Sequence, residues 1–232
     1  MKSVFCKTYV ICLPKWWVVL ILIALLLCAS FAFIKNIGHY LAVTKPEQSP
    51  YLVVEGWQDE YSLKEALIRF ESGGYKILIT TGGPIKGWRH STYKNYADYS
   101  ADLLVSNGLD EGKLVSVPTP ASAQNRTFLS AVMVRKWFDK KGILVSSVDV
   151  FTESVHARRT RKLYELAFYN SVDIGIYASS PQTYNLSSWW NTSEGAKSVI
   201  TEIIGFFWVT CCFSPGDYGS HQEMWGLYSN KS

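Results

Sequence analysis

The sequence predicts an α/β fold: a Rossmann-like three-layer domain with a mostly parallel five-stranded sheet, preceded by one N-terminal transmembrane helix. Short β-rich runs alternate with longer helical patterns from residue 51 onward, which is typical of βαβ units covered on both faces. A long uncharged apolar run precedes them. The chain has 232 residues, 48% hydrophobic and 15% aromatic, which is enough for one well-buried domain and excludes a disordered protein.

The positive charge of the chain does not indicate nucleic-acid binding. The net charge is +4, with 23 basic and 19 acidic residues. Four of the lysines lie before residue 36, where there is no acid. The rest of the chain is therefore formally neutral and offers no basic face to a phosphate backbone.

The apolar run from Trp16 to Ile34 has 19 residues without a charge, and about 20 are needed to cross a bilayer as a helix. We predict a cytoplasmic tail over residues 1–15, a transmembrane anchor over 16–34 and a tether over 35–50. Lys2, Lys7 and Lys15 precede the anchor, so the positive-inside rule places the N-terminus in the cytoplasm. The protein is then single-pass in the plasma (inner) membrane, with its domain on the extracytoplasmic side.

A cleaved signal peptide is the alternative, because Ser30 and Ala32 offer small residues to a signal peptidase. The retained anchor is favoured, since signal peptides have an apolar core of only about 7–15 residues. Only Cys211 and Cys212 follow the anchor. Neighbouring cysteines seldom bridge, so no disulfide framework is expected, and no spacing fits a metal site.

The elements of the domain, over residues 51–213, follow from local patterns. The strands are Tyr51–Glu55, Ile77–Thr81, Leu114–Val117, Val148–Thr152 and Asp173–Tyr177. The helices lie near Ser62–Ser72, Thr92–Asn107, Thr127–Lys140, Ala157–Phe168 and Ser193–Cys212. Ser62 and Glu65 are spaced as a capping box, and glycines end the first three helices. Residues 214–232 form a loop-like tail.

The last helix is strongly apolar, but Lys197 and Glu202 interrupt its apolar stretch. The uninterrupted part is too short to cross a membrane. We therefore predict a terminal helix packed on the core.

Ligands of open parallel sheets bind beyond the carboxyl ends of the strands, and polar residues stand there. Glu55 ends the first strand, and Gly82 and Gly83 follow the second. A glycine turn can present amides to an anion, although an ordinary turn into a helix also uses glycine. Neither a Walker loop nor a dinucleotide fingerprint is present.

His156 follows the fourth strand, and Arg159 lies one helical turn later on the same face as Leu163. The core stripe of this helix is Ala157, Thr160, Tyr164 and Phe168. Basic residues in a first turn oppose the helix dipole, so His156 and Arg159 favour an arriving anion. Arg158 and Arg161 are expected to be solvated, with Arg161 paired to Glu165.

Arg126 and Thr127 open another helix, where Thr127 or Asn125 can cap. Glu55 is an acid or base, or orients His156 or an arginine, or is one half of a structural ion pair. Asp98 and Tyr93 are expected to face the same crevice. The candidate catalytic residues are thus His156 and Glu55, with no metal, and the candidate ligand-binding residues are Gly82, Gly83, Asp98, Arg126, Thr127 and Arg159.

At these residues the chain resembles the ElyC/SanA/YdcF family of bacterial envelope, vancomycin-exclusion-like proteins. The matching pieces are Leu52-Val53-Val54-Glu55-Gly56-Trp57, Thr81-Gly82-Gly83, Asn125-Arg126-Thr127 and His156-Ala157-Arg158-Arg159. The resemblance runs from about residue 50 to 205. Where the family commonly has an acidic residue and Asn after the Thr, this chain has Phe128, Leu129 and Ser130.

The resemblance implies a Rossmann-like domain and a role in the cell envelope, in peptidoglycan or lipid-carrier metabolism. A soluble member is reported to bind S-adenosylmethionine, so a nucleotide-like ligand stays open and the cofactor is unknown. Membrane-anchored members carry one N-terminal helix with the domain outside.

Two functions compete at this point, and whether the chain is an enzyme stays open. In the first, the crevice binds a phosphate-bearing envelope intermediate such as a lipid-linked phosphate, and hydrolyses or transfers it. His156 would be acid or base, Arg126 and Arg159 charge clamps, and the Gly82 and Gly83 amides oxyanion donors. The tryptophans expected to add apolar contacts are Trp57, Trp88, Trp189 and Trp190.

The second function is a non-catalytic ligand-sensing or scaffolding module among envelope-complex proteins. It rests on the lack of a recognisable metal cluster or nucleophilic triad in the sequence, and on the neutral domain, which gives no steering field.

Overall fold

A computed structural model of the chain describes residues 14–85, 92–122 and 125–214, which divide into two compact units between Ile37 and Gly38. Helix α1 (Trp16–Leu41) has 26 residues, about 39 Å of helix. It is long and apolar enough to cross a membrane, and it is the one described helix that is. The predicted anchor lies within it. Trp88 and nearly all of the tail 214–232 lie outside the described residues.

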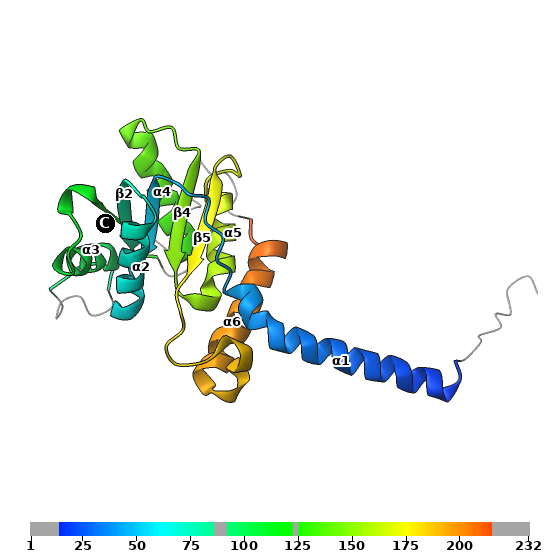
Figure 1. Ribbon diagram of the computed structural model, residues 1–232. Helices are drawn as coiled ribbons and strands as arrows, with labels where there is room; N and C mark the ends of the chain where they lie inside the picture. The colour runs from blue at the N-terminus through cyan, green and yellow to red at the C-terminus, as the bar shows by residue number, and fades with distance from the viewer. Residues whose placement is uncertain (1–13, 86–91, 123–124, 215–232) are drawn as a thin grey trace, which may run out of the picture. The chain divides into compact units, whose positions relative to one another are not determined.

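The second unit is built on a five-stranded, all-parallel sheet (Figure 1). Its strands are β1 (Tyr51–Glu55), β2 (Ile77–Gly82), β3 (Leu114–Pro118), β4 (Ser147–Thr152) and β5 (Asp173–Ala178). Each lies within one residue of its predicted bounds. The spatial order is β3-β2-β1-β4-β5. The chain places β2 and β3 on one side of β1 and then returns to place β4 and β5 on the other side, so the winding reverses at the point in the sheet between β1 and β4. Such a switch point is where α/β sheets bind ligands.

Helices cover both faces of the sheet, as predicted. They are α2 (Glu60–Ser72), α3 (Tyr96–Ser106), α4 (Arg126–Lys141), α5 (Ala157–Ala167) and α6 (Ser193–Cys211), with short 3-10 turns η2 (Glu111–Lys113), η3 (Ser154–His156) and η4 (Leu186–Asn191). Helices α2 and α3 pack on one face, and α4 and α5 on the other. Helix α6 packs against α5.

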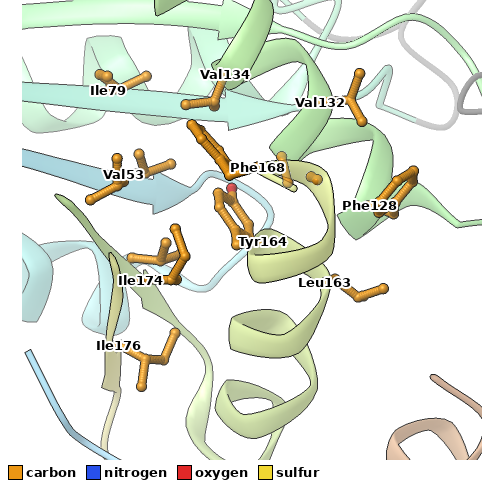
Figure 2. Close-up of a cluster of buried hydrophobic side chains, with 14 of the residues drawn as sticks. Val53, Ile79, Phe128, Val132, Val134, Leu163, Tyr164, Phe168, Ile174 and Ile176 are labelled. Atoms are coloured by element: carbon orange, nitrogen blue, oxygen red, sulfur yellow. The ribbon is translucent and has the colours of Figure 1, made fainter. Parts of the chain in front are cut away.

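Strand alternation supplies both apolar layers. Under α4 and α5, one buried cluster contains Val53 and Ile79 of the strands and Tyr164 and Phe168 of the α5 segment, which Figure 2 labels. Under α2 and α3, Leu52 and its neighbours in β1 and β2 form the second layer. The stripe predicted for α5 is confirmed, because Ala157, Thr160, Tyr164 and Phe168 are all buried.

The predicted capping box of α2 is wrong. Asp59 is the N-cap, and its Oδ1 accepts the Ser62 amide at 2.8 Å. The Ser62 hydroxyl instead donates to Ser179 Oγ at 3.2 Å. Gly142 does end α4 in the left-handed conformation, with φ 65°.

Most of the segment expected to be a tether, from Gly38 onward, belongs to the second unit. Helix α1 continues to Leu41, and Lys45 pairs with Ile176 in an antiparallel bridge. The Glu47 and Ser49 amides then donate to Asp149 of β4. The chain is thus fixed to the sheet before β1 begins.

Two local expectations also fail. Cys211 and Cys212 form a disulfide. Arg158 is not simply solvated, because its guanidinium stacks on the Tyr40 ring at 3.7 Å. Helix α6 packs on the core as predicted, but with one face only, because Ile204 and Phe207 on its other face are 65% and 69% exposed. The expected pair of Arg161 with Glu165 is confirmed at 3.2 Å.

Candidate functional site

A cavity of about 880 Å³ opens at the carboxyl edge of the sheet, beside the switch point between β1 and β4. Its wall comes from the ends of β1, β2 and β4, the first turns of α4 and α5, and one side of α6. Most of the candidate residues line it together, namely Glu55, Gly82, Gly83, Arg126, Thr127, His156 and Arg159. Asp98 and Tyr93 are not among its lining residues.

Glu55 ends β1 with its side chain 1% exposed. Its carboxylate accepts hydrogen bonds from the hydroxyls of Thr152 and Thr160. Among the described residues, the one basic group within ion-pair distance is His156, with Nε2 3.9 Å from Glu55 Oε2. Burial, and then the charge of Glu55, raise the pKa of the Tyr164 hydroxyl well above its ordinary value. The carboxylate of Glu55 thus accepts hydrogen bonds from two neutral hydroxyls and lies beside the imidazole of His156.

His156 stands between two carboxylates. Its Nε2 lies 3.3 Å from Thr127 Oγ1, and its Nδ1 lies 3.0 Å from Oε1 of Glu202 on α6. The Trp57 ring meets the imidazole edge-on, with centroids 5.3 Å apart. A proton on either ring nitrogen thus has an acceptor within the site.

Arg159 Nη2 lies 2.9 Å from both His156 Nδ1 and Glu202 Oε1. A carboxylate is a stronger acceptor than a neutral imidazole nitrogen, so we assign both the Arg159 proton and the Nδ1 proton to Glu202. The Nε2 nitrogen is then free to accept a proton from the Thr127 side. This tautomer is the one a general base needs.

The sequence did not identify Glu202 as a site residue. Arg159 holds it with two charged hydrogen bonds of 2.8 and 2.9 Å. Burial opposes ionisation of Glu202, but the hydrogen bonds from His156 and Arg159 prevail and lower its pKa to about 2. The available signal was a carboxylate within an apolar helix, which must find a partner when buried.

Arg159 is consequently not a free clamp for an anion, because Glu202 already occupies its guanidinium. The cavity-lining cations with no ion pair among the described residues are Arg126 and Lys197. Arg126 is exposed and is the first residue of α4. Asn125, the N-cap, makes no side-chain capping bond, so the positive end of α4 faces the cavity without that cap.

The glycine turn has a packing reason as well as a place at the site. A Cβ on Gly82 would lie 2.7 Å from the Tyr96 Cβ, so only glycine lets α3 start this close to β2. The carbonyl of Gly83 accepts the Tyr96 amide at 2.9 Å. Packing therefore explains Gly82, and its role as an oxyanion donor stays a prediction.

Asp98 is committed elsewhere. Its Oδ1 accepts the Ser116 hydroxyl at 2.6 Å, and its Oδ2 accepts the Asn95 amide nitrogen at 2.6 Å. Asn95 in turn caps α3. These bonds fix α3 to β3 and leave Asp98 outside the crevice.

A second carboxyl that was not among the predicted site residues is Glu153, which lines the cavity and is exposed. Burial raises the pKa of Glu153; a protonated His156 would lower it, and the charges of nearby carboxylates raise it further. It directly follows β4, so its place in the chain could have identified it.

The arrangement contains a hydroxyl, an imidazole and a carboxylate in series: Thr127, His156 and Glu202. This is the geometry of a nucleophile, a general base and a group that orients the base. The sequence did not reveal it, because Glu202 lies on a helix far along the chain. Within residues 14–85, 92–122 and 125–214, no group of three His, Cys, Asp or Glu side chains is placed to hold a metal ion.

The chain matches no protein-family model and no curated protein. The similarity to the ElyC/SanA/YdcF family therefore stays an interpretation of the motifs.

Proposed function

We propose that the cavity binds a phosphate-bearing or otherwise anionic ligand, with its charge held by Arg126 and the first turn of α4. The observation that carries this proposal is Arg126, a cavity-lining guanidinium with no ion-pair partner among the described residues. Guanidinium groups and helix N-termini both favour phosphate. Lys197, on α6, adds a second cation to the wall.

The proposed setting is the cell envelope. The apolar length of α1 supports a single-pass anchor in the plasma (inner) membrane, and the positive-inside rule supports an extracytoplasmic domain. The resemblance to the ElyC/SanA/YdcF family supports a role in peptidoglycan or lipid-carrier metabolism. A nucleotide or S-adenosylmethionine is the other ligand class, and envelope-complex proteins are the proposed partners.

A hydrolytic or transfer activity is the second candidate, favoured by the Thr127, His156 and Glu202 series. With an ester in the cavity, His156 Nε2 would take the proton of the attacking hydroxyl, from Thr127 or from water, and return it to the leaving oxygen. Glu202 would stabilise the charged imidazole through Nδ1. Arg126 would face the negative charge that develops on the ligand.

Binding is tested by calorimetry on the full chain in detergent, against a panel of polyprenyl phosphate, nucleotides and S-adenosylmethionine. Arg126→Ala should weaken the tightest ligand by about 1.5–3 kcal/mol, or about 10- to 150-fold. Lys140→Ala is the matched control, because it removes one positive charge from the other end of the same helix. Equal affinities in all three proteins would contradict the proposal.

Turnover of the ligand that binds separates an enzyme from a sensor. Thr127→Val removes the hydroxyl while keeping the shape, and Thr127→Ser restores it. For an enzyme in which Thr127 is the nucleophile, we expect loss of product release in the Val variant and recovery in the Ser variant. Binding without product release in the wild type would favour the non-catalytic sensing module instead.

A further inference from the structure

We propose that the outward face of α6, formed by Ile200, Ile204, Phe207 and Trp208, docks on the surface of the lipid bilayer. The four side chains are 49%, 65%, 69% and 41% exposed. Their spacing places them on one side of the helix. The opposite side, with Val199 among others, is buried in the domain.

Such an exposed apolar face is unusual on a helix whose opposite side packs on the core of its domain. Single exposed apolar residues are common, but a contiguous apolar face on one helix marks an interaction surface. Lys197 lies one turn before Ile200 and is exposed. Aromatic and aliphatic residues with a flanking lysine are the composition of helices that lie in a membrane interface.

The short length of chain between the proposed anchor and Tyr40 indicates that lipid covers the apolar face of α6. This step rests on the proposed anchor. Helix α6 is tied to Tyr40, whose ring lies 6.2 Å from that of Phe206. Tyr40 follows Ile34, the end of the uncharged apolar run, by only six residues. Six residues span about 9 Å as a helix and about 20 Å when fully extended. With Ile34 at the edge of the hydrocarbon, α6 must therefore lie close to the lipid headgroups.

Docking also has a consequence for the cavity. Trp208 belongs to the apolar face and also lines the cavity. A docked α6 therefore brings one edge of the cavity to the lipid surface. A ligand could then keep its charged group in the cavity while an apolar part stays in the membrane.

The test uses the full chain in nanodiscs that hold one copy each, with a fluorophore on a single cysteine and a quencher carried by the lipids. Ile204→Cys reports the apolar face, with the native cysteines changed to Ser. Leu144→Cys is the matched control, because Leu144 is an exposed leucine between α4 and β4. The native Cys28 alone reports the anchor. We expect most of the fluorescence to be lost at Ile204→Cys and at Cys28, and none at Leu144→Cys.

Each outcome has one meaning. Quenching at Cys28 without quenching at Ile204→Cys overturns docking and leaves the anchor standing. Quenching at Ile204→Cys but not at Cys28 supports docking and overturns the anchor. Equal quenching at Leu144→Cys overturns docking, because the signal is then not specific to α6.

A second variant guards against a trivial signal. Phe207→Glu, added to Ile204→Cys, places a charge on the exposed face without touching the core. We expect it to abolish the quenching while circular dichroism stays unchanged, and persistent quenching would overturn the proposal. A probe at Ile204→Cys that is shielded from an aqueous quencher but not reached by the lipid quencher would assign the face to residues 215–232 and overturn it as well.

Discussion

Two buried carboxylates on neighbouring strands, Asp149 of β4 and Glu55 of β1, have different surroundings. Asp149 is 0% exposed. It accepts the Glu47 and Ser49 amides at 2.7 and 3.2 Å and the Tyr75 hydroxyl at 2.7 Å. It lines no part of the cavity. Three donors from the amino-terminal side of the sheet therefore fix this carboxylate in place.

Glu55 is buried equally well, but its donors are the hydroxyls of Thr152 and Thr160. It lines the cavity and faces His156. Hydroxyls can turn, whereas backbone amides cannot. The two carboxylates therefore differ not in burial but in position: Glu55 adjoins the cavity and an imidazole, and Asp149 does not.

The close packing at Asp149 reinforces the contrast. A Cβ on Gly175 would lie 1.7 Å from Asp149 Oδ1, so β5 needs glycine where it passes the carboxylate. Burial, followed by hydrogen bonds to Tyr177 and Asp149, raises the pKa of Tyr75 far above its ordinary value. Tyr75 thus stays a donor at any pH the protein meets.

The largest effect is expected for Asp149→Asn. The amide nitrogen of Asn would face an N–H or O–H donor, and charged hydrogen bonds would be lost, which should cost about 3–5 kcal/mol of stability. Urea unfolding of the full chain in mild detergent measures this. A loss below about 1 kcal/mol would mean that Asp149 is not the structural carboxylate described above.

A somewhat smaller effect is expected for Glu202. Its pKa falls from the ordinary 4.5 to about 2 on folding, so the folded state binds fewer protons than the unfolded state between these values. The stabilisation, about 3 kcal/mol, should be fully present above about pH 5 and be lost as the pH falls toward 2.

Urea unfolding of wild type and Glu202→Gln at several pH values checks this. The two stabilities should differ most near pH 7 and converge near pH 2. A constant difference across the range would show that the charge of Glu202 does not contribute. Because Glu202 orients His156, the variant should also lower any turnover.

The smallest change in stability is expected for Glu55→Gln. The Gln carbonyl can still accept from Thr152 or Thr160, so stability should change by about 1 kcal/mol or less. Loss of the charge beside His156 should instead alter ligand binding or turnover. A variant that loses stability as Asp149→Asn does, with unchanged binding, would remove the distinction between the two carboxylates.

The sequence was sufficient for the elements but not for their arrangement. All five strands were predicted within one residue of their bounds, because each is a short β-rich run between turn residues. The order β3-β2-β1-β4-β5 depends on where the chain reverses its winding, which no local pattern encodes. The cap of α2 was misplaced because Asp59 and Ser62 both fit a cap by composition.

Part of the candidate site could also be predicted from the sequence. His156 and Arg159 were predicted to lie together, and the rule that ligands bind at the carboxyl ends of strands brought in Glu55 and Thr127. Glu202 was missed because only the packing of α6 on α5 brings it to His156. That one contact turned Arg159 from an expected ligand clamp into a residue that positions the imidazole.

The central claim is that the ligand binds at the carboxyl ends of the strands, beside Glu55, and not at the amino ends of the strands, beside Asp149. Hydrogen–deuterium exchange of the full chain, with and without the tightest-binding anion of the calorimetric panel, tests it most directly. We predict slower exchange on ligand addition at the starts of α4 and α5, residues 126–130 and 154–160, and no change at residues 45–51 or 75–78. Protection from exchange that is confined to the amino ends of the strands, beside Asp149, would contradict the account, and so would the absence of protection at a saturating ligand concentration.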